Sequence, residues 1–319
     1  MRYHPDAEQH DLAGAFAETV AALLPVERLR ESRVESAATL ASLDEAGLFG
    51  LAAAEEHGGS ALGATEEALI MIAVGRQLAA PNVVATVGAG PAIAGSVGFA
   101  DGKAPSVAAA YVHNGRTIVI DGGAADYIFV RDGDDARVHP AGDLKVIDKG
   151  SFLSTLSEAG SLAAPVASVG NNGALRLRLI DAAVLAGIAD GALTLAVDYA
   201  KMREQFGRPI GTFQAVKHHA ADMAIAAACA RDQVAYAAVA LDDGRDDAAL
   251  QVESALLVAG QAAVKNAGLC IQIHGGIGFS DEADPHLYLK RAQTILAIAG
   301  GLEACAERIA AIPPMLAAA

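Results

Sequence analysis

Two segments of the sequence combine residue types that can bind a diphosphate group. The first reads RxxFGxxIGxFQ and contains Arg203, Phe206 and Gln214; the second reads QxxGGxGF and contains Gln272, Gly275 and Gly276. A glycine-rich turn exposes backbone N–H groups that can approach a diphosphate closely. An arginine near such a turn binds the same group with a directed fork of donors. A helix end rich in glycine, next to a surface arginine, has the same composition, so residue types alone leave both interpretations open.

Other standard motifs are missing from the sequence. Gly88-Ala89-Gly90-Pro91 begins like a dinucleotide-binding fingerprint, but Ile93 stands where the third glycine belongs and no clear strand precedes it. We therefore interpret it as a helix junction. His218 and His219 are adjacent, so they diverge on a helix and are not expected to share a metal ion.

Composition narrows the class of protein. Hydrophobic residues make up 53% of the 319 residues and charged residues 19%, which excludes disorder for the bulk of the chain. The net charge of −15 argues against binding nucleic acid by neutralising phosphates. The three cysteines, Cys229, Cys270 and Cys305, have no paired spacing and indicate reduced thiols in a cytoplasm. Uninterrupted apolar runs such as 182–189 are too short to span a bilayer, so a soluble protein is expected.

The elements that must position these motifs fall into three zones, predicted as domains over 1–102, 103–172 and 173–319. The first zone is helical. Apolar spacing predicts a helix over 11–24 that stops at Pro25, and a second over 26–46 that stops at Gly47. Thr65 is a plausible N-cap for a third helix, which Pro81 would end.

The second and third zones differ in periodicity. Short runs with strand-forming residues, separated by turn signals such as Asn114-Gly115, predict a small β domain with strands at 107–112, 117–120, 127–131 and 144–147. Long helices with short connections follow and are typical of an antiparallel bundle. We expect them at 181–204, 213–241 and 247–271, with two shorter helices after Asp284. The predicted fold class is mainly α with a small β domain.

These motifs resemble those of the acyl-CoA dehydrogenases, and the resemblance extends to Gly47-Leu48-Phe49-Gly50-Leu51 and to the segment 55–59 near the N-terminus. It covers most of the chain and is strongest from Gly173 onward. Members of that family are flavoproteins, commonly tetramers, in which a glutamate removes the α proton of an acyl-CoA and FAD accepts the β hydride. The resemblance implies that a set of residues reaches an FAD held mainly by a neighbouring subunit, namely Arg203, Phe206, Gln214, Gln272, Gly275 and Gly276.

The family's catalytic glutamate has no counterpart at either of its two known places. Matching the motifs puts Leu177, which precedes Arg178, at one place and Ala299 at the other. Neither side chain accepts a proton. Asp181 and Glu303 each lie about one helical turn further on, so either is a candidate for a displaced base.

The β domain is also reduced. It lacks the family's Thr-Glu-Pro-Gly-x-Gly-Ser-Asp and Trp-Ile-Thr segments, and the chain has no tryptophan. The resemblance therefore favours a non-catalytic subunit of a heteromeric (α2β2) acyl-CoA dehydrogenase, like those of actinobacteria that oxidise fatty acid or steroid side-chain thioesters. A full-length catalytic partner would bind the acyl-CoA and share its FAD. The alternatives are a self-sufficient homo-oligomer that uses Asp181 or Glu303, and a structural or binding homologue without flavin.

Overall fold

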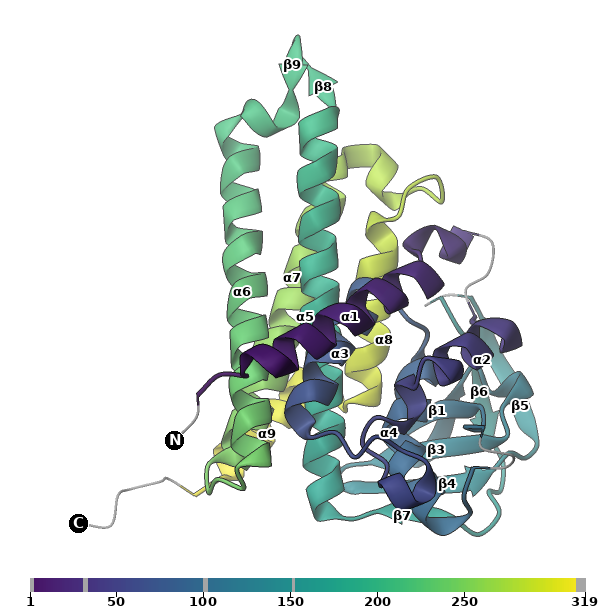
Figure 1. Cartoon of the computed structure of the whole chain (residues 1–319). Coiled ribbons are helices and arrows are strands. Elements are labelled where there is room, and N and C mark those ends of the chain that lie inside the picture. The colour runs from purple at the N-terminus through teal and green to yellow at the C-terminus, as the bar shows by residue number, and fades with distance from the viewer. Residues whose placement is uncertain (1–2, 31–33, 100–102, 151–152, 314–319) are drawn as a thin grey trace.

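The computed structural model describes residues 3–30, 34–99, 103–150 and 153–313. Figure 1 shows a tall helical bundle, a β-sheet beside its lower end, and N-terminal helices that cross the bundle and cover the sheet. The resemblance to the acyl-CoA dehydrogenases predicts these three parts in this order along the chain. The mainly helical fold class with a small β region is confirmed.

The N-terminal region forms four α-helices joined by short 3₁₀ turns. They are α1 (Ala7–Leu23), η1 (Val26–Arg30), α2 (Ala37–Glu45), η2 (Leu48–Gly50), η3 (Glu55–His57), α3 (Ala64–Arg76) and α4 (Pro81–Ser96). A capping box at Asp6 and Gln9 starts α1, because each side chain satisfies a backbone N–H that the first turn leaves unpaired. The chain leaves α1 before Pro25, as expected. Gly47 adopts φ 83° after α2, which glycine tolerates at little cost.

The predicted helix over 26–46 is wrong. The chain forms η1 and then α2, which starts at Ala37 with Ser36 as its N-cap. Glu35 is the reason for the break: its carboxylate pairs with Arg28 at 2.6 Å and accepts a hydrogen bond from Ala80 N at 3.2 Å. These contacts hold Glu35 against Arg28 and the start of α4, and helix propensity alone does not anticipate them.

Pro81 begins α4 rather than ending a structured segment, and the expected junction at residues 88–91 lies inside this helix. Pro91 has no N–H for the carbonyl of Val87. The Arg176 guanidinium supplies the missing donor at 3.1 Å, and it also donates to Gly88 O at 3.0 Å. A side chain from the long helix α5 (Asn171–Met202) therefore makes a proline tolerable in mid-helix.

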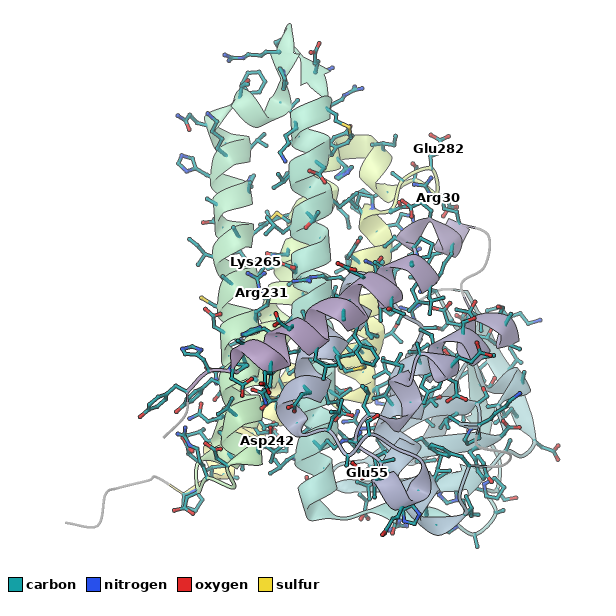
Figure 2. The ribbon with its side chains drawn as sticks, in the orientation of Figure 1. Arg30, Glu55, Arg231, Asp242, Lys265 and Glu282 are labelled. Atoms are coloured by element: carbon teal, nitrogen blue, oxygen red, sulfur yellow. The ribbon has the colours of Figure 1, made fainter. Side chains whose placement is uncertain are left out.

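Thr65 is not the N-cap of α3. Gly63 holds that position. The capping carboxylate belongs to Asp242, the last residue of helix α6 (Gln214–Asp242), and accepts hydrogen bonds from Ala64 N at 2.7 Å and Thr65 N at 2.9 Å. Figure 2 shows Asp242 at the lower end of the bundle, beside the start of α3. The cap comes from far away in the sequence, so a local motif could not reveal it.

Residues 107–169 form a seven-stranded sheet in the order β5-β6-β2-β1-β3-β4-β7. The strands are β1 (Val107–His113), β2 (Arg116–Ile120), β3 (Tyr127–Asp132), β4 (Asp135–Pro140), β5 (Leu144–Lys149), β6 (Thr155–Ala159) and β7 (Ala167–Val169). The four predicted strands are present as β1, β2, β3 and β5. The strands β4, β6 and β7 were not predicted, because charged or small residues interrupt their runs of strand-forming residues. Pairing with their neighbours decides their conformation.

The bundle contains the long helices α5 (Asn171–Met202), α6 (Gln214–Asp242) and α7 (Ala248–His274), with α8 (Pro285–Ile298) and α9 (Gly301–Ala311). The predicted bundle helices are confirmed, although α5 starts ten residues before Asp181. Asn266 of α7 ties the three long helices together by donating to Ala189 O at 3.0 Å and Met223 O at 2.9 Å. Small alanine side chains fill much of the core, which lets the helices approach closely.

Three bundle helices are long and apolar enough to cross a membrane when judged by length and composition alone, at Gly173–Met202, Gln214–Asp242 and Ala248–Phe279. The sequence predicted no such segment, because its uninterrupted apolar runs are short. A helix with a few scattered charged residues can nevertheless reach this mean hydropathy. In this structure 72% of the most apolar 18-residue stretch of α5 is buried inside the protein. A helix that is apolar on most faces is typical of a buried bundle as well as of a membrane span.

The crossing of α3 and α5 depends on two glycines. A Cβ at Gly187 would lie 2.0 Å from Ile72 O, and one at Gly75 would lie 2.1 Å from Val184 O. Gly187→Ala is therefore expected to lower the free energy of unfolding by about 1–3 kcal/mol, because the helices must move apart. The measurement is chemical denaturation of the isolated chain.

The matched control for this prediction is Gly14→Ala in α1, where no atom lies within 4 Å of the position that the added Cβ would take. There the added methyl group should stabilise the chain by about 0.5–1 kcal/mol through helix propensity. An unchanged unfolding free energy for Gly187→Ala would contradict the close crossing.

Candidate functional site

The first motif forms an exposed hairpin at the end of α5. Strands β8 (Glu204–Gln205) and β9 (Arg208–Pro209) pair, and Phe206 and Gly207 make the tip with φ 54° and 75°. The ring of Phe206 is 92% exposed. Arg208 lies over Phe213, with its guanidinium carbon 4.3 Å from the ring centroid, and this contact fixes the base of the hairpin.

The second motif forms the turn η7 (Gly275–Phe279) directly after α7. Gly275 adopts φ 67°, and no atom lies within 4 Å of a Cβ built on Gly275 or Gly276. Gly278 differs, because a Cβ there would lie 2.7 Å from Ile271 O. The turn therefore folds back on α7 through Gly278 and leaves the backbone of Gly275 and Gly276 open to an approaching group.

The structure brings the two motifs together at one end of the bundle. Tyr199 of α5 stacks on His274 of α7 with ring centroids 4.0 Å apart. The side chains of Arg203, Gln214 and Gln272 are exposed, and no hydrogen bond or ion pair joins them to any residue that the structure describes. All six predicted residues thus lie on this end. The side-chain donors and acceptors of Arg203, Gln214 and Gln272 are free for a ligand, whereas the Gly275 N–H donates to Gln272 O and Ile271 O at the end of α7.

This end is remote from the chain's own sheet. Figure 1 shows β8 and β9 at the top of the bundle and the seven-stranded sheet beside its lower part. Arg131 of β3 contacts Asp181 of α5 at 2.6 Å, and Asp181 and Arg203 are 22 positions apart. Along a helix that rises about 1.5 Å per residue, the separation is about 33 Å. The hairpin of the first motif therefore lies far from the sheet of its own chain.

Exposed apolar side chains accompany the motifs. Besides Phe206, the exposed fractions are 75% for Phe279, 74% for Met202 and 41% for Ile277. Exposed apolar side chains gathered in one region are typical of a surface that another molecule covers. The end of the bundle therefore has the features of an interface as well as of a phosphate site.

Leu177 and Ala299, the positions matched to the glutamate, are both buried. Leu177, Phe129 and Ile298 line a cavity of about 20 Å³ between α4, the sheet, α5 and α8. Such a volume holds about one water molecule, whereas ligand pockets measure roughly 300–1,000 Å³. The place where a substrate would meet a base in this chain is filled by its own side chains.

Asp181 borders the same cavity but is tied into an ionic network. It is fully buried, and Arg131 Nη1 lies 2.6 Å from its Oδ2. Burial raises the pKa of Asp181, and the nearby guanidinium groups of Arg131, Arg178 and Arg308 oppose that rise. Glu253 completes the network, at 3.1 Å from Arg178 and 2.8 Å from Arg308.

Sequence reasoning missed this network, although one signal was present. Arg131 ends the apolar run YIFVR of β3, and an arginine there requires a partner once the strand is buried. Glu303, the other candidate base, is exposed on α9 and does not line the cavity. Neither acid is placed to act on a substrate in this chain.

Comparison with known proteins decides the family. The family model of the acyl-CoA dehydrogenase C-terminal domain matches residues 172–312, and that of the N-terminal domain matches residues 6–97. The chain belongs to the acyl-CoA dehydrogenase family. The resemblance stated from its motifs is therefore confirmed. The fold of this family is that of flavin-dependent oxidoreductases. The roles of the six motif residues and the domain boundaries stay predictions.

Several relatives of this acyl-CoA dehydrogenase family member are known. Acyl-CoA dehydrogenase FadE34 of Mycobacterium tuberculosis is 35% identical over 85% of this chain and 41% of its own length. Acyl-CoA dehydrogenase IpdE2 of the same organism is 45% identical over 33% of this chain and 31% of its own length. The chain thus matches less than half of the length of these relatives.

Solved structures share the fold. One chain of the ChsE4-ChsE5 complex from Mycobacterium tuberculosis superposes with a TM-score of 0.76 at 24% identity, covering 98% of this chain and 100% of that one. A variant of the Tcur3481-Tcur3483 steroid ACAD gives a TM-score of 0.77 at 22% identity, covering 95% and 97%. PigA with FAD and proline gives 0.78 at 18% identity, covering 98% of each chain. At these identities the likeness shows the fold alone.

Proposed function

We propose that this chain is the non-catalytic subunit of a heteromeric acyl-CoA dehydrogenase and completes the FAD site of a catalytic partner. The observation that carries the proposal is the position of Arg203 at the end of α5, about 33 Å along the helix from Asp181, which borders the chain's own closed cavity. Free side-chain donors lie at the motif end of the bundle, and no base lies beside the closed cavity. Both features fit a subunit that contributes only to a neighbour's cofactor site.

The residues at the bundle end fit the phosphate part of FAD. Arg203 offers an unpaired guanidinium, and the open backbone at Gly275 and Gly276 allows close approach. Phe206 is free to cover an adjacent face of the cofactor. The lower cavity does not fit the flavin ring, because about 20 Å³ is available. In the assembled enzyme the flavin supplies hydride acceptance, and the residues of this chain bind and orient the cofactor.

Two solved relatives of similar fold are named as pairs, the ChsE4-ChsE5 complex and the Tcur3481-Tcur3483 steroid ACAD. They support a mixed assembly with a full-length catalytic subunit, for which we propose an α2β2 arrangement in the cytoplasm. The acyl-CoA thioester would be bound mainly by that partner. The name of the Tcur3481-Tcur3483 steroid ACAD suggests the substrate class, which is a CoA thioester on the side chain of a bulky steroid.

The alternatives lack support from the geometry. A self-sufficient enzyme would need Asp181 or Glu303 as base, but the first is buried in an ionic network and the second is exposed away from the cavity. A flavin-free structural homologue would not need Arg203, Gln214 and Gln272 to be free together at one end.

Co-expression tests the proposal. The chain purified alone should contain little FAD and show no dehydrogenation of acyl-CoA thioesters with an artificial electron acceptor. Co-purified with its catalytic partner, found by pull-down with the tagged chain, it should give a yellow and active complex. A yellow, active preparation of the isolated chain would contradict the proposal, and a colourless complex would favour the structural homologue.

A further inference from the structure

The two halves of the proposed cofactor site are joined by a pair of stacked rings. Tyr199 lies near the end of α5 and His274 at the end of α7, and their planes are inclined by 20° at a centroid distance of 4.0 Å. No other aromatic contact links the two motifs among the residues that the structure describes. Stacked rings at this distance attract each other beyond the effect of the area they bury.

His274 is held in one orientation. Its Nδ1 donates to Cys270 O at 2.8 Å, one turn back in α7, and this bond assigns the proton to Nδ1. The ring is buried. Burial lowers the pKa of His274, against smaller opposing effects of the Cys270 carbonyl and the Asp284 carboxylate. The imidazole is therefore neutral near pH 7, and a fixed, neutral ring faces Tyr199.

Each ring of the pair is connected directly to a proposed cofactor-binding group. Arg203 N donates to Tyr199 O at 2.8 Å, so Arg203 follows one turn after the stacked tyrosine. On the other side, Gly275 is the next residue after His274, and a Cβ at Gly278 would lie 3.0 Å from His274 Cβ. The glycine turn therefore rests on His274 itself.

We propose that Tyr199 and His274 form a positioning clamp that sets the distance between Arg203 and the Gly275–Gly276 turn. This inference rests on the proposed function, because the clamp matters only if both groups bind one cofactor. Two donor groups on separate helices bind a diphosphate more tightly when their spacing is fixed beforehand, because less ordering is then needed on binding.

The test measures FAD affinity of the assembled complex by fluorescence titration after removal of bound FAD, with thermal unfolding recorded for each variant. His274→Ala is expected to weaken FAD binding about two- to tenfold, the loss in affinity that corresponds to one ring stack. His274→Phe keeps a ring and should restore affinity to nearly the original value, and Tyr199→Phe should leave it unchanged. If His274→Ala does not fold, Tyr199→Leu removes the stack from the other helix.

The double variant Tyr199→Leu/His274→Ala should bind FAD as tightly as the single variant with the lower affinity, because both changes remove the same contact. Additive losses would overturn the clamp, and so would an unchanged FAD affinity in a variant that only melts earlier. Arg203→Ala separates the two hypotheses. If it leaves FAD affinity unchanged, the proposed function fails; if it weakens binding while His274→Ala does not, only the clamp fails.

Discussion

Arg203→Ala in the assembled complex is expected to weaken FAD binding about ten- to hundredfold. The guanidinium is exposed on the hairpin end of α5, without a partner among the residues that the structure describes. A hydrogen bond to a charged group contributes about 1.5–3 kcal/mol, and each 1.4 kcal/mol is about a factor of ten in affinity. The measurement is FAD titration of the complex, together with turnover at saturating FAD.

A companion change tests the same site from the other motif. Gly276→Ala places a methyl group in open space, so the isolated chain should fold normally while the cofactor meets an obstruction. Arg137→Ala on β4, an exposed arginine paired with exposed Asp135, is the control and should leave FAD binding unchanged. Equal FAD affinity in Arg203→Ala and Arg137→Ala would place the cofactor elsewhere.

Asp181→Asn is expected to destabilise the isolated chain by about 3–5 kcal/mol, because it leaves buried positive charge without compensation. Arg131 lies 2.6 Å from the lost carboxylate and is itself 12% exposed, and Arg178 is 7% exposed. Glu253 is the one buried acid that remains in the described network. Chemical denaturation measures the effect. Turnover of the assembled complex, normalised to bound FAD, should be unchanged.

The control for this charge removal lies on the same helix. Asp198→Asn breaks an exposed pair with Lys201 at 3.2 Å, which is worth about 0–1 kcal/mol. A collapse of turnover in Asp181→Asn, with FAD still bound and the complex intact, would instead identify Asp181 as a catalytic base. It would favour the self-sufficient enzyme over the mixed assembly.

The two expected results separate the two ends of α5. At the Arg203 end, a change should affect cofactor binding and leave the stability of the chain nearly intact, because the side chain is exposed. At the Asp181 end, a change should affect stability and leave the chemistry intact, because the carboxylate is buried against arginines. One helix thus joins the proposed binding surface to a small closed cavity.

Local signals in the sequence predicted much of the fold. Pro25 and Gly47 ended helices where expected, and β1, β2, β3 and β5 followed their runs of strand-forming residues. The errors have a common cause. Glu35 interrupts a predicted helix by pairing with Arg28 and Ala80, and Arg176 makes Pro91 acceptable in α4. Each involves a partner that local periodicity does not show.

By itself the sequence determined the family, the order of helical and β segments, and the absence of a carboxylate at residues 177 and 299, because these follow from residue types at fixed spacing. The tertiary structure alone decided that the two motifs meet through Tyr199 and His274, and that Asp181 is buried in contact with Arg131. Distances between helices and the burial of charge arise from packing between segments far apart in the chain. Whether an acid is a base or a structural ion depends on them.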